Sequence, residues 1–130
     1  MSNRLPQLIQ GEFRQSATDT WIPVTNPASG EVLCEAPAAT ADEMEQAIAA
    51  AKAAFLEWRD VPVSERARLM LRYQHLLKAR HDDIAKVLAK ETGKVFADAK
   101  GDVWRGIEVV EHAANIASLM MGETVENVAR

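Results

Sequence analysis

The residues from Glu91 to Met121 carry the most constraining pattern of this 130-residue chain. Apolar side chains recur there at every third or fourth position, which places them on one side of a 3.6-residue helix. We therefore predict one long helix. Its apolar stripe is Phe96, Ala99, Val103, Ile107, Val110, Ala114, Ala117 and Met121. Its opposite, polar side is Asp98, Asp102, Arg105, Glu108, His112 and Asn115.

Two glycines, Gly101 and Gly106, interrupt this predicted helix. Each should destabilise a helix interior by about 1 kcal/mol relative to alanine. Two interpretations stay open. Small residues let a neighbouring helix pack closely, and they also let another backbone or a ligand come near the helix surface.

Composition excludes several classes of protein. With 48% apolar and 26% charged residues, the chain has the composition of one globular domain. No apolar run is long enough to span a bilayer, and the first residues lack the apolar core of a secretory signal. A net charge of −4 argues against nucleic acid as a partner. The single cysteine forms no disulfide framework, so we expect a reducing, cytoplasmic location and no membrane partner.

The first part of the chain predicts short strands. Residues 7–13 are typical of a strand with a turn or bulge at Gly11, and residues 20–25 and 31–36 of two more strands, joined by a turn over residues 26–30. Pro23 indicates an edge position, because proline has no N–H to donate to a neighbouring strand. We predict one small antiparallel sheet of three strands, which cannot close a core by itself.

Helices follow. Thr40 and Glu43 form a capping-box pattern at the start of a helix. We expect that helix to bury Met44, Ile48, Ala51, Phe55 and Trp58.

Further along, Ser64 fits the N-cap of a second helix, and a break is expected near His81 and Asp82. Gly93 fits a left-handed C-terminal cap of the helix that follows, and Gly122 the end of the last helix.

Most candidate chemical groups have structural explanations. A nucleophilic cysteine needs a nearby cation, general base or helix N-terminus to lower its pKa, whereas Cys34 follows two apolar strand residues and precedes Glu35. We therefore expect Cys34 to be structural. The histidines have no spacing typical of a metal site, and they are His75, His81 and His112.

Two charged groups are weak candidates. Three arginines of one predicted helix are interleaved with Glu65 and apolar residues, which favours a solvated helix face over an anion site; they are Arg66, Arg68 and Arg72. Glu108, Glu111 and His112 can touch on one helix, but no nucleophile accompanies them, so an acid–base role is weakly supported.

Arg105 is the strongest candidate. Its planar guanidinium suits a carboxylate held by two hydrogen bonds, and the two glycines leave room beside it. The alternative, an ion pair with a neighbouring carboxylate, is equally open; the neighbours are Asp98, Asp102 and Glu108.

Nearly the whole chain resembles the N-terminal part of aldehyde dehydrogenases. The resemblance lies in the segments LIQGEF at 8–13, TNPASGEV at 25–32, AFLEW at 54–58 and ETGK at 91–94. Two further segments, SERARLMLRYQ at 64–74 and GDVWRGIEVVEHA at 101–113, are similar to the CoA-acylating methylmalonate-semialdehyde dehydrogenase branch. The second is the more specific.

This resemblance implies an α/β fold in the parent protein. Residues 1–39 would be its N-terminal strands, and residues 40–130 the helical layer of an NAD-binding domain that continues beyond the chain. The segment itself would be a short antiparallel sheet followed mainly by α-helices. The implied assembly is a homo-oligomer, a homotetramer, acting on a small-molecule semialdehyde.

The implied activity is NAD-dependent oxidation of methylmalonate or malonate semialdehyde to propionyl-CoA or acetyl-CoA, in valine or inositol catabolism. Arg105 would bind the substrate carboxylate. The catalytic cysteine, the general base and the NAD and CoA sites would lie outside this chain, so the segment alone should be inactive. The alternatives are another semialdehyde dehydrogenase and a non-catalytic helical interaction module.

Overall fold

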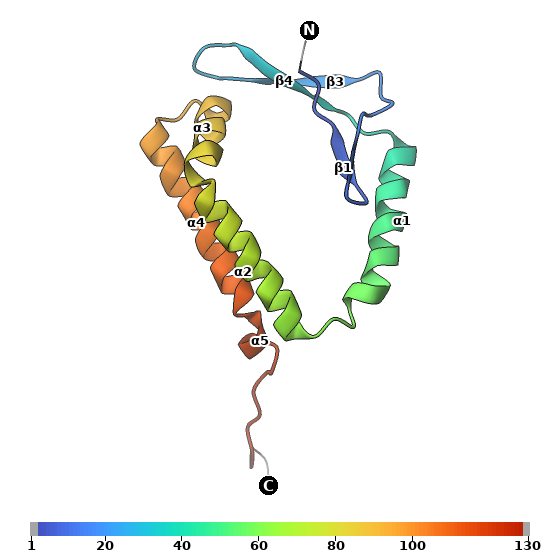
Figure 1. Ribbon diagram of the computed structural model, residues 1–130, viewed down its shortest axis with the longest axis vertical. Coiled ribbons are helices and arrows are strands. Elements are labelled where there is room, and N and C mark those ends of the chain that lie inside the picture. Colours follow the sequence, from blue (N-terminus) through green and yellow to red (C-terminus); the bar gives the residue numbers. More distant parts are fainter. Residues whose placement is uncertain (1–2, 129–130) are drawn as a thin grey trace.

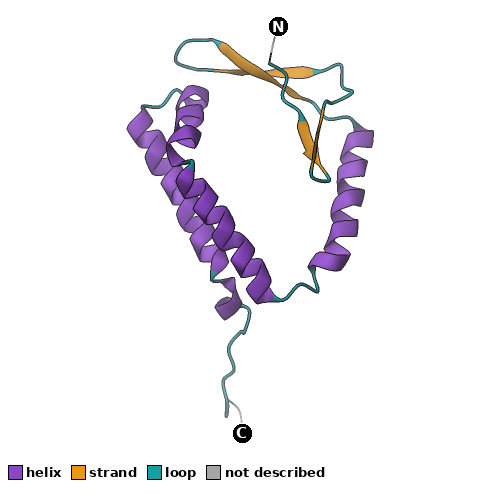
Figure 2. Cartoon of the chain, in the orientation of Figure 1, coloured by secondary structure: helices purple, strands orange, loops and turns teal. Residues whose placement is uncertain are grey.

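The computed structural model describes residues 3–128, so residues 1–2 and 129–130 of the two predicted parts lie outside the described residues. Two β-hairpins come first and helices follow (Figures 1 and 2). The strands are β1 (Gln7–Ile9), β2 (Glu12–Arg14), β3 (Trp21–Thr25) and β4 (Val32–Pro37). The helices are α1 (Ala41–Trp58), α2 (Val63–Ala79), α3 (His81–Thr92), α4 (Phe96–Ala114) and α5 (Ile116–Leu119). Within residues 3–128, none of the helices combines the length and apolar character that crossing a bilayer requires.

The predicted single sheet is wrong in one respect, because the strands form two separate two-stranded antiparallel sheets. Residues 7–13 do not make one bulged strand. Gln10 and Gly11 both have positive φ angles, of 57° and 80°, which reverses the chain and pairs β1 with β2. Positive φ at both central residues is the mark of a type I′ hairpin turn, whose twist matches that of the strands.

The predicted edge position of Pro23 is confirmed. Pro23 lies opposite Glu35 in the β3–β4 hairpin. The backbone of Glu35 is turned away from Pro23, since its N–H donates to Asn3 O at 3.0 Å and its carbonyl accepts from Leu5 N at 2.9 Å. Facing residues in such a non-hydrogen-bonded pair both point outward. The proline nitrogen therefore lies on the open edge, where a missing N–H removes no ladder bond.

The capping box that begins α1 is confirmed and has further partners. Thr40 Oγ1 accepts from Glu43 N at 3.3 Å, and Thr40 N donates to Glu43 Oε2 at 2.9 Å. The same carboxylate also accepts from Ser16 Oγ and Ala17 N, each at 2.8 Å. The backbone N–H groups of Thr40 and then Ala17 are the main causes that lower the pKa of Glu43 to about 2. Glu43 thus ties the segment between the hairpins to the start of α1.

The predicted burial of the α1 stripe is wrong. Met44, Ile48, Phe55 and Trp58 expose 55%, 59%, 57% and 43% of their surfaces, and Ala51 is exposed as well. Figure 1 shows α1 on the far side of the molecule from α2 and α4, next to β1. Helical spacing predicts that these side chains share a face, but burial needs a second surface, and no element among residues 3–128 covers that face.

The core lies where α4 packs on α2 and α3, and the middle of the predicted α4 stripe is confirmed there (Figure 1). Ala99, Ile107 and Ala114 are buried, with Ala85 of α3 opposite. The ends of the stripe were predicted wrongly, since Phe96 is 41% and Met121 82% exposed.

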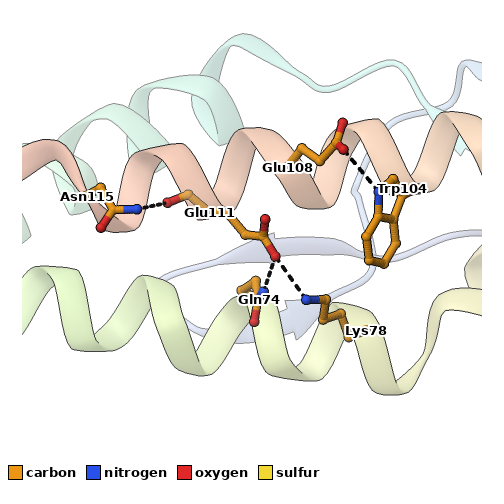
Figure 3. Close-up of polar contacts among 6 residues, drawn as sticks. All are labelled: Gln74, Lys78, Trp104, Glu108, Glu111 and Asn115. Carbon is orange, nitrogen blue, oxygen red and sulfur yellow. Dashed lines mark hydrogen bonds and ion pairs between the residues drawn. The ribbon is translucent and has the colours of Figure 1, made fainter.

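The single long helix is also wrong, because the chain forms α3, α4 and α5 with breaks at residues 93–95 and at Asn115. Asn115 Nδ2 donates to the carbonyl of Glu111 at 3.0 Å (Figure 3), a side-chain bond that competes with the regular helical pattern. The helix therefore ends before Gly122, which has a φ of 68°.

Other helix ends differ by a residue or two. Helix α2 begins at Val63 with Pro62 as its N-cap, so Ser64 lies inside the first turn and does not cap it. The break before α3 is at Arg80, just before His81. The left-handed cap at Gly93 is confirmed by its φ of 70°.

Candidate functional site

Arg105 lies on the exposed side of α4 and lines a hollow of about 390 Å³. The other lining residues are Lys94, Ala97, Asp98, Gly101 and Asp102. All but Lys94 belong to α4, at spacings of three and four residues that keep them on one face. Lys94 comes from the short loop between α3 and α4.

The glycines leave open space on α4. A Cβ added at Gly101 or at Gly106 would meet no atom within 4 Å, so neither glycine accommodates a closely packed helix among residues 3–128. Gly101 lies four residues before Arg105 and widens the hollow beside it. Gly106 lines a second, mainly apolar hollow of about 260 Å³ between α2, α3 and α4. Of the two interpretations, open space for another group is the one the described residues support.

An ion pair closes one side of the Arg105 hollow. Lys94 Nζ donates to Asp102 Oδ2, with the two side chains 46% and 37% exposed. The hydrogen bond from Lys94 is the main cause that holds the pKa of Asp102 below its usual value, and the charge of Arg105 lowers it further. Asp102 is therefore an ionised carboxylate whose first partner is Lys94.

The alternative partners of Arg105 are not engaged with it. Within residues 3–128, Arg105 forms no hydrogen bond and no ion pair. Asp102 is held by Lys94, and Glu108 Oε1 accepts from Trp104 Nε1 at 3.0 Å (Figure 3). The guanidinium of Arg105 is therefore exposed beside a hollow, with its donors available to a planar anion.

Cys34 lies on β4 opposite Val24 and is half-buried. It forms no hydrogen bond in the described part of the chain, and its position in an antiparallel hairpin is remote from any helix N-terminus. Such an environment does not activate a thiol. The structural role predicted for this cysteine agrees with these surroundings.

No group of three or more potential metal ligands occurs among residues 3–128, in agreement with the histidine spacing. His81 joins helices instead. Its Nε2 lies 2.9 Å from the carbonyl oxygen of Lys100, and its ring packs edge-on against Trp104 with 6.0 Å between centroids. Lys100 in turn pairs with Asp82 at 2.7 Å and lowers the pKa of that carboxyl.

The glutamates of the weak acid–base group are separated by their partners. Glu111 accepts from Lys78 Nζ at 2.9 Å and from Gln74 Nε2, both on α2 (Figure 3). Lys78 and then Gln74 lower its pKa. Glu111 therefore joins α2 to α4, whereas Glu108 belongs to Trp104, and no shared acid–base site exists.

The predicted solvated arginine face holds only in part. Arg68 is exposed and pairs with Glu65. Arg66 differs, because its Nε is buried and has no hydrogen-bond partner in the described structure. It lines a hollow with Trp58 and Met70 at the junction of α2 and α5.

Lys94 is the site residue that the sequence interpretation missed. We considered only carboxylates on the helix that carries Arg105, whereas Lys94 reaches Asp102 from the preceding loop. One signal was present. A lysine just before a helix N-terminus is unfavourable with the helix dipole, so a carboxylate within two turns is its natural partner.

Comparison with known proteins gives consistent matches. Residues 13–130 match the model of the aldehyde dehydrogenase family. The chain is 48% identical, over its full length, to the probable acylating, mitochondrial methylmalonate-semialdehyde/malonate-semialdehyde dehydrogenase of Dictyostelium discoideum, and spans 25% of it.

Solved structures agree. The methylmalonate-semialdehyde dehydrogenase of Oceanimonas doudoroffii matches 99% of the chain with a TM-score of 0.88 and 38% identity, over 26% of its own length. A putative methylmalonate-semialdehyde dehydrogenase of Sinorhizobium meliloti 1021, complexed with NAD, matches 100% of the chain with a TM-score of 0.89 and 32% identity, again over 26% of its length. The chain therefore spans about a quarter of the relatives it matches.

Proposed function

This chain belongs to the aldehyde dehydrogenase family, and we propose that it forms the N-terminal part of an NAD-dependent methylmalonate-semialdehyde dehydrogenase that passes its acyl product to CoA. The relatives named above support this substrate class, and one curated relative, from Geobacillus kaustophilus, is named malonate-semialdehyde dehydrogenase 1. Both semialdehydes carry a carboxylate close to the reacting aldehyde carbon. The protein would need a fixed cation to hold that carboxylate.

The availability of Arg105 carries this proposal. An arginine fork binds a carboxylate through two parallel hydrogen bonds, which fixes the orientation of the ligand as well as its position. Arg105 is exposed on a hollow, while both carboxylates within three residues of it are bound by other donors. Since the guanidinium stays charged at every working pH, it would bind the ionised substrate without a proton exchange.

NAD and CoA do not fit the described residues. A dinucleotide site of the Rossmann type needs a glycine-rich turn between a parallel strand and a helix. The strands of residues 3–128 are antiparallel hairpins, and Gly101 and Gly106 lie inside α4. The covalent step also needs an activated thiol, which Cys34 is not. We assign both cofactor sites and the catalytic cysteine to parts of the enzyme beyond this chain.

The role assigned to this chain is therefore orientation of the substrate. Holding the carboxylate with two hydrogen bonds would limit the rotation of a small aldehyde, so that its carbonyl carbon is presented to the thiol in one geometry. An aldehyde without a carboxylate would lose this restraint.

The test uses the complete enzyme and two aldehydes, methylmalonate semialdehyde and propanal, with NADH formation as the readout. A hydrogen-bonded charge pair contributes about 1.5–3 kcal/mol. Arg105→Ala should then lower kcat/KM for methylmalonate semialdehyde by roughly ten- to 150-fold and leave propanal nearly unaffected. Arg105→Lys should recover part of the loss, because a point charge replaces a fork. The matched control is Arg68→Ala, which removes an exposed arginine paired with Glu65.

Equal losses on the two aldehydes would refute the carboxylate role of Arg105. No NADH from either aldehyde with the unaltered complete protein would instead favour the alternative of a non-catalytic helical module. Higher kcat/KM for another semialdehyde would favour the second alternative within the family. Homotetramer formation and a cytoplasmic location stay predictions, to be measured by light scattering and by cell fractionation.

A further inference from the structure

We propose that Lys94 is a positioning residue that keeps Arg105 available to the substrate, by holding the carboxylate of Asp102 in an ion pair. This inference rests on the proposed role of Arg105 as the carboxylate-binding group. It adds the residue that controls whether that group is free.

Asp102 is the natural competitor of the substrate. It precedes Arg105 by three residues on α4, and opposite charges at this spacing are neighbours on a helix surface. Both residues line the same hollow. The charge of Arg105 already contributes to the lowered pKa of Asp102, which shows that the two groups interact through space. Without another partner, Asp102 would form an internal ion pair with Arg105.

Lys94 removes this competitor. The loop between α3 and α4 brings its ammonium group to Asp102 Oδ2, on the wall of the hollow. The pairing is specific in its direction, because Lys94 reaches Asp102 from outside α4 and leaves the guanidinium of Arg105 unbound within residues 3–128.

The remaining acidic neighbours do not compete in the structure. Glu108 follows Arg105 by three residues, but it accepts a hydrogen bond from Trp104 Nε1 (Figure 3). Asp98 lies seven residues before Arg105, about 10 Å along the helix axis at 1.5 Å per residue. Asp102 is therefore the carboxylate whose release would matter most.

Loss of Lys94 should have two effects of the same sign. Asp102 would capture Arg105, and its uncompensated negative charge would repel the incoming carboxylate. Apparent affinity falls in proportion to the fraction of protein in the competent state. If Asp102 held Arg105 for nine-tenths of the time, the KM for a carboxylated aldehyde would rise about tenfold. Turnover of an uncharged aldehyde would change little.

The experiment compares three variants of the complete enzyme, Lys94→Met, Asp102→Asn and the double variant, with methylmalonate semialdehyde and propanal. Lys94→Met should raise KM for methylmalonate semialdehyde by about five- to twentyfold, with kcat and the kinetics on propanal within about twofold. Asp102→Asn alone should keep KM within about threefold of the unaltered enzyme. The double variant should return to the value of Asp102→Asn, because no carboxylate remains to capture Arg105.

Three outcomes would overturn the inference. One is a double variant as impaired as Lys94→Met, since Lys94 would then bind substrate directly or support the fold. Another is a KM for Asp102→Asn raised as much as that for Lys94→Met, since the ion pair itself would then be required. This single variant decides the matter even if Lys94→Met fails to fold. The third is an equal loss on both aldehydes.

Arg105→Ala, assayed in parallel, separates this inference from the proposed function. Equal losses of Arg105→Ala on the two aldehydes would remove the carboxylate role and, with it, the basis of the inference. A selective loss in Arg105→Ala combined with an unchanged Lys94→Met would leave the proposed function standing and refute the role of Lys94 alone.

Discussion

Gly93 offers a sharp test of how the β3–β4 hairpin meets the helices. Its φ of 70° is left-handed, and an added Cβ would lie 2.9 Å from Pro27 Cγ and 3.4 Å from the backbone nitrogen of Ala28. The hairpin turn therefore rests directly on the C-terminal cap of α3. Gly93→Ala should introduce two penalties, one from backbone strain and one from displacing this turn.

The matched control is Gly30→Ala, in the same hairpin turn. Gly30 has a φ of 74°, but a Cβ there would meet nothing within 4 Å, so only the backbone penalty applies. That penalty is about 1–2 kcal/mol, less roughly 0.4–1 kcal/mol gained from a stiffer unfolded chain. Forcing a methyl group into a packed contact adds about 1–3 kcal/mol. We therefore expect Gly93→Ala to destabilise the complete protein by about 1–3 kcal/mol more than Gly30→Ala.

Urea unfolding of the complete protein, followed by tryptophan fluorescence, measures this difference as a shift in midpoint at constant slope. Adding Pro27→Ala to Gly93→Ala should recover most of it, since the closest atom is then removed, and the double-mutant cycle isolates that contact. Equal destabilisation by the two glycine substitutions, within about 0.5 kcal/mol, would refute the reasoning. The hairpin turn would then not press on α3.

Four further predictions follow from the same structure. The isolated chain should produce no NADH from methylmalonate semialdehyde, NAD and CoA; a rate abolished by Cys34→Ala would contradict this. Because the α1 stripe is exposed, the isolated chain should bind an apolar dye or self-associate in light scattering, and a monodisperse monomer with one sharp thermal transition would argue against it. The pKa of Glu43 is about 2 when folded and near 4.5 otherwise, so its stabilising effect should be full above about pH 4.5 and disappear as the pH falls toward 2. Unfolding midpoints of Glu43→Gln should lose that part of the pH dependence, and an unchanged profile would contradict the assignment. Ile107→Ala, at a site 1% exposed, should lower the free energy of unfolding by about 2–5 kcal/mol in urea titrations, and a loss below 1 kcal/mol would mean that α4 does not form the core.

Local features were determined by the sequence, because their physics involves residues a few positions apart. The capping box of Thr40 and Glu43, the edge position of Pro23 and the left-handed cap at Gly93 each depend on one turn of chain. The buried middle of α4 around Ile107 follows from helical spacing alone. The position of Arg105 on the polar side of α4 was predicted for the same reason.

Only the tertiary structure decided which groups these residues meet. Helical spacing shows that the α1 stripe shares one face, but it cannot show whether a second surface covers that face. The bond between Glu111 and Lys78 joins residues 33 positions apart, and that between Glu43 and Ser16 joins residues 27 apart. The sequence left Arg105 with two options, an internal ion pair or a ligand. Lys94 settled the first for Asp102, because the loop after α3 carries its charge to a carboxylate that α4 alone would have offered to Arg105.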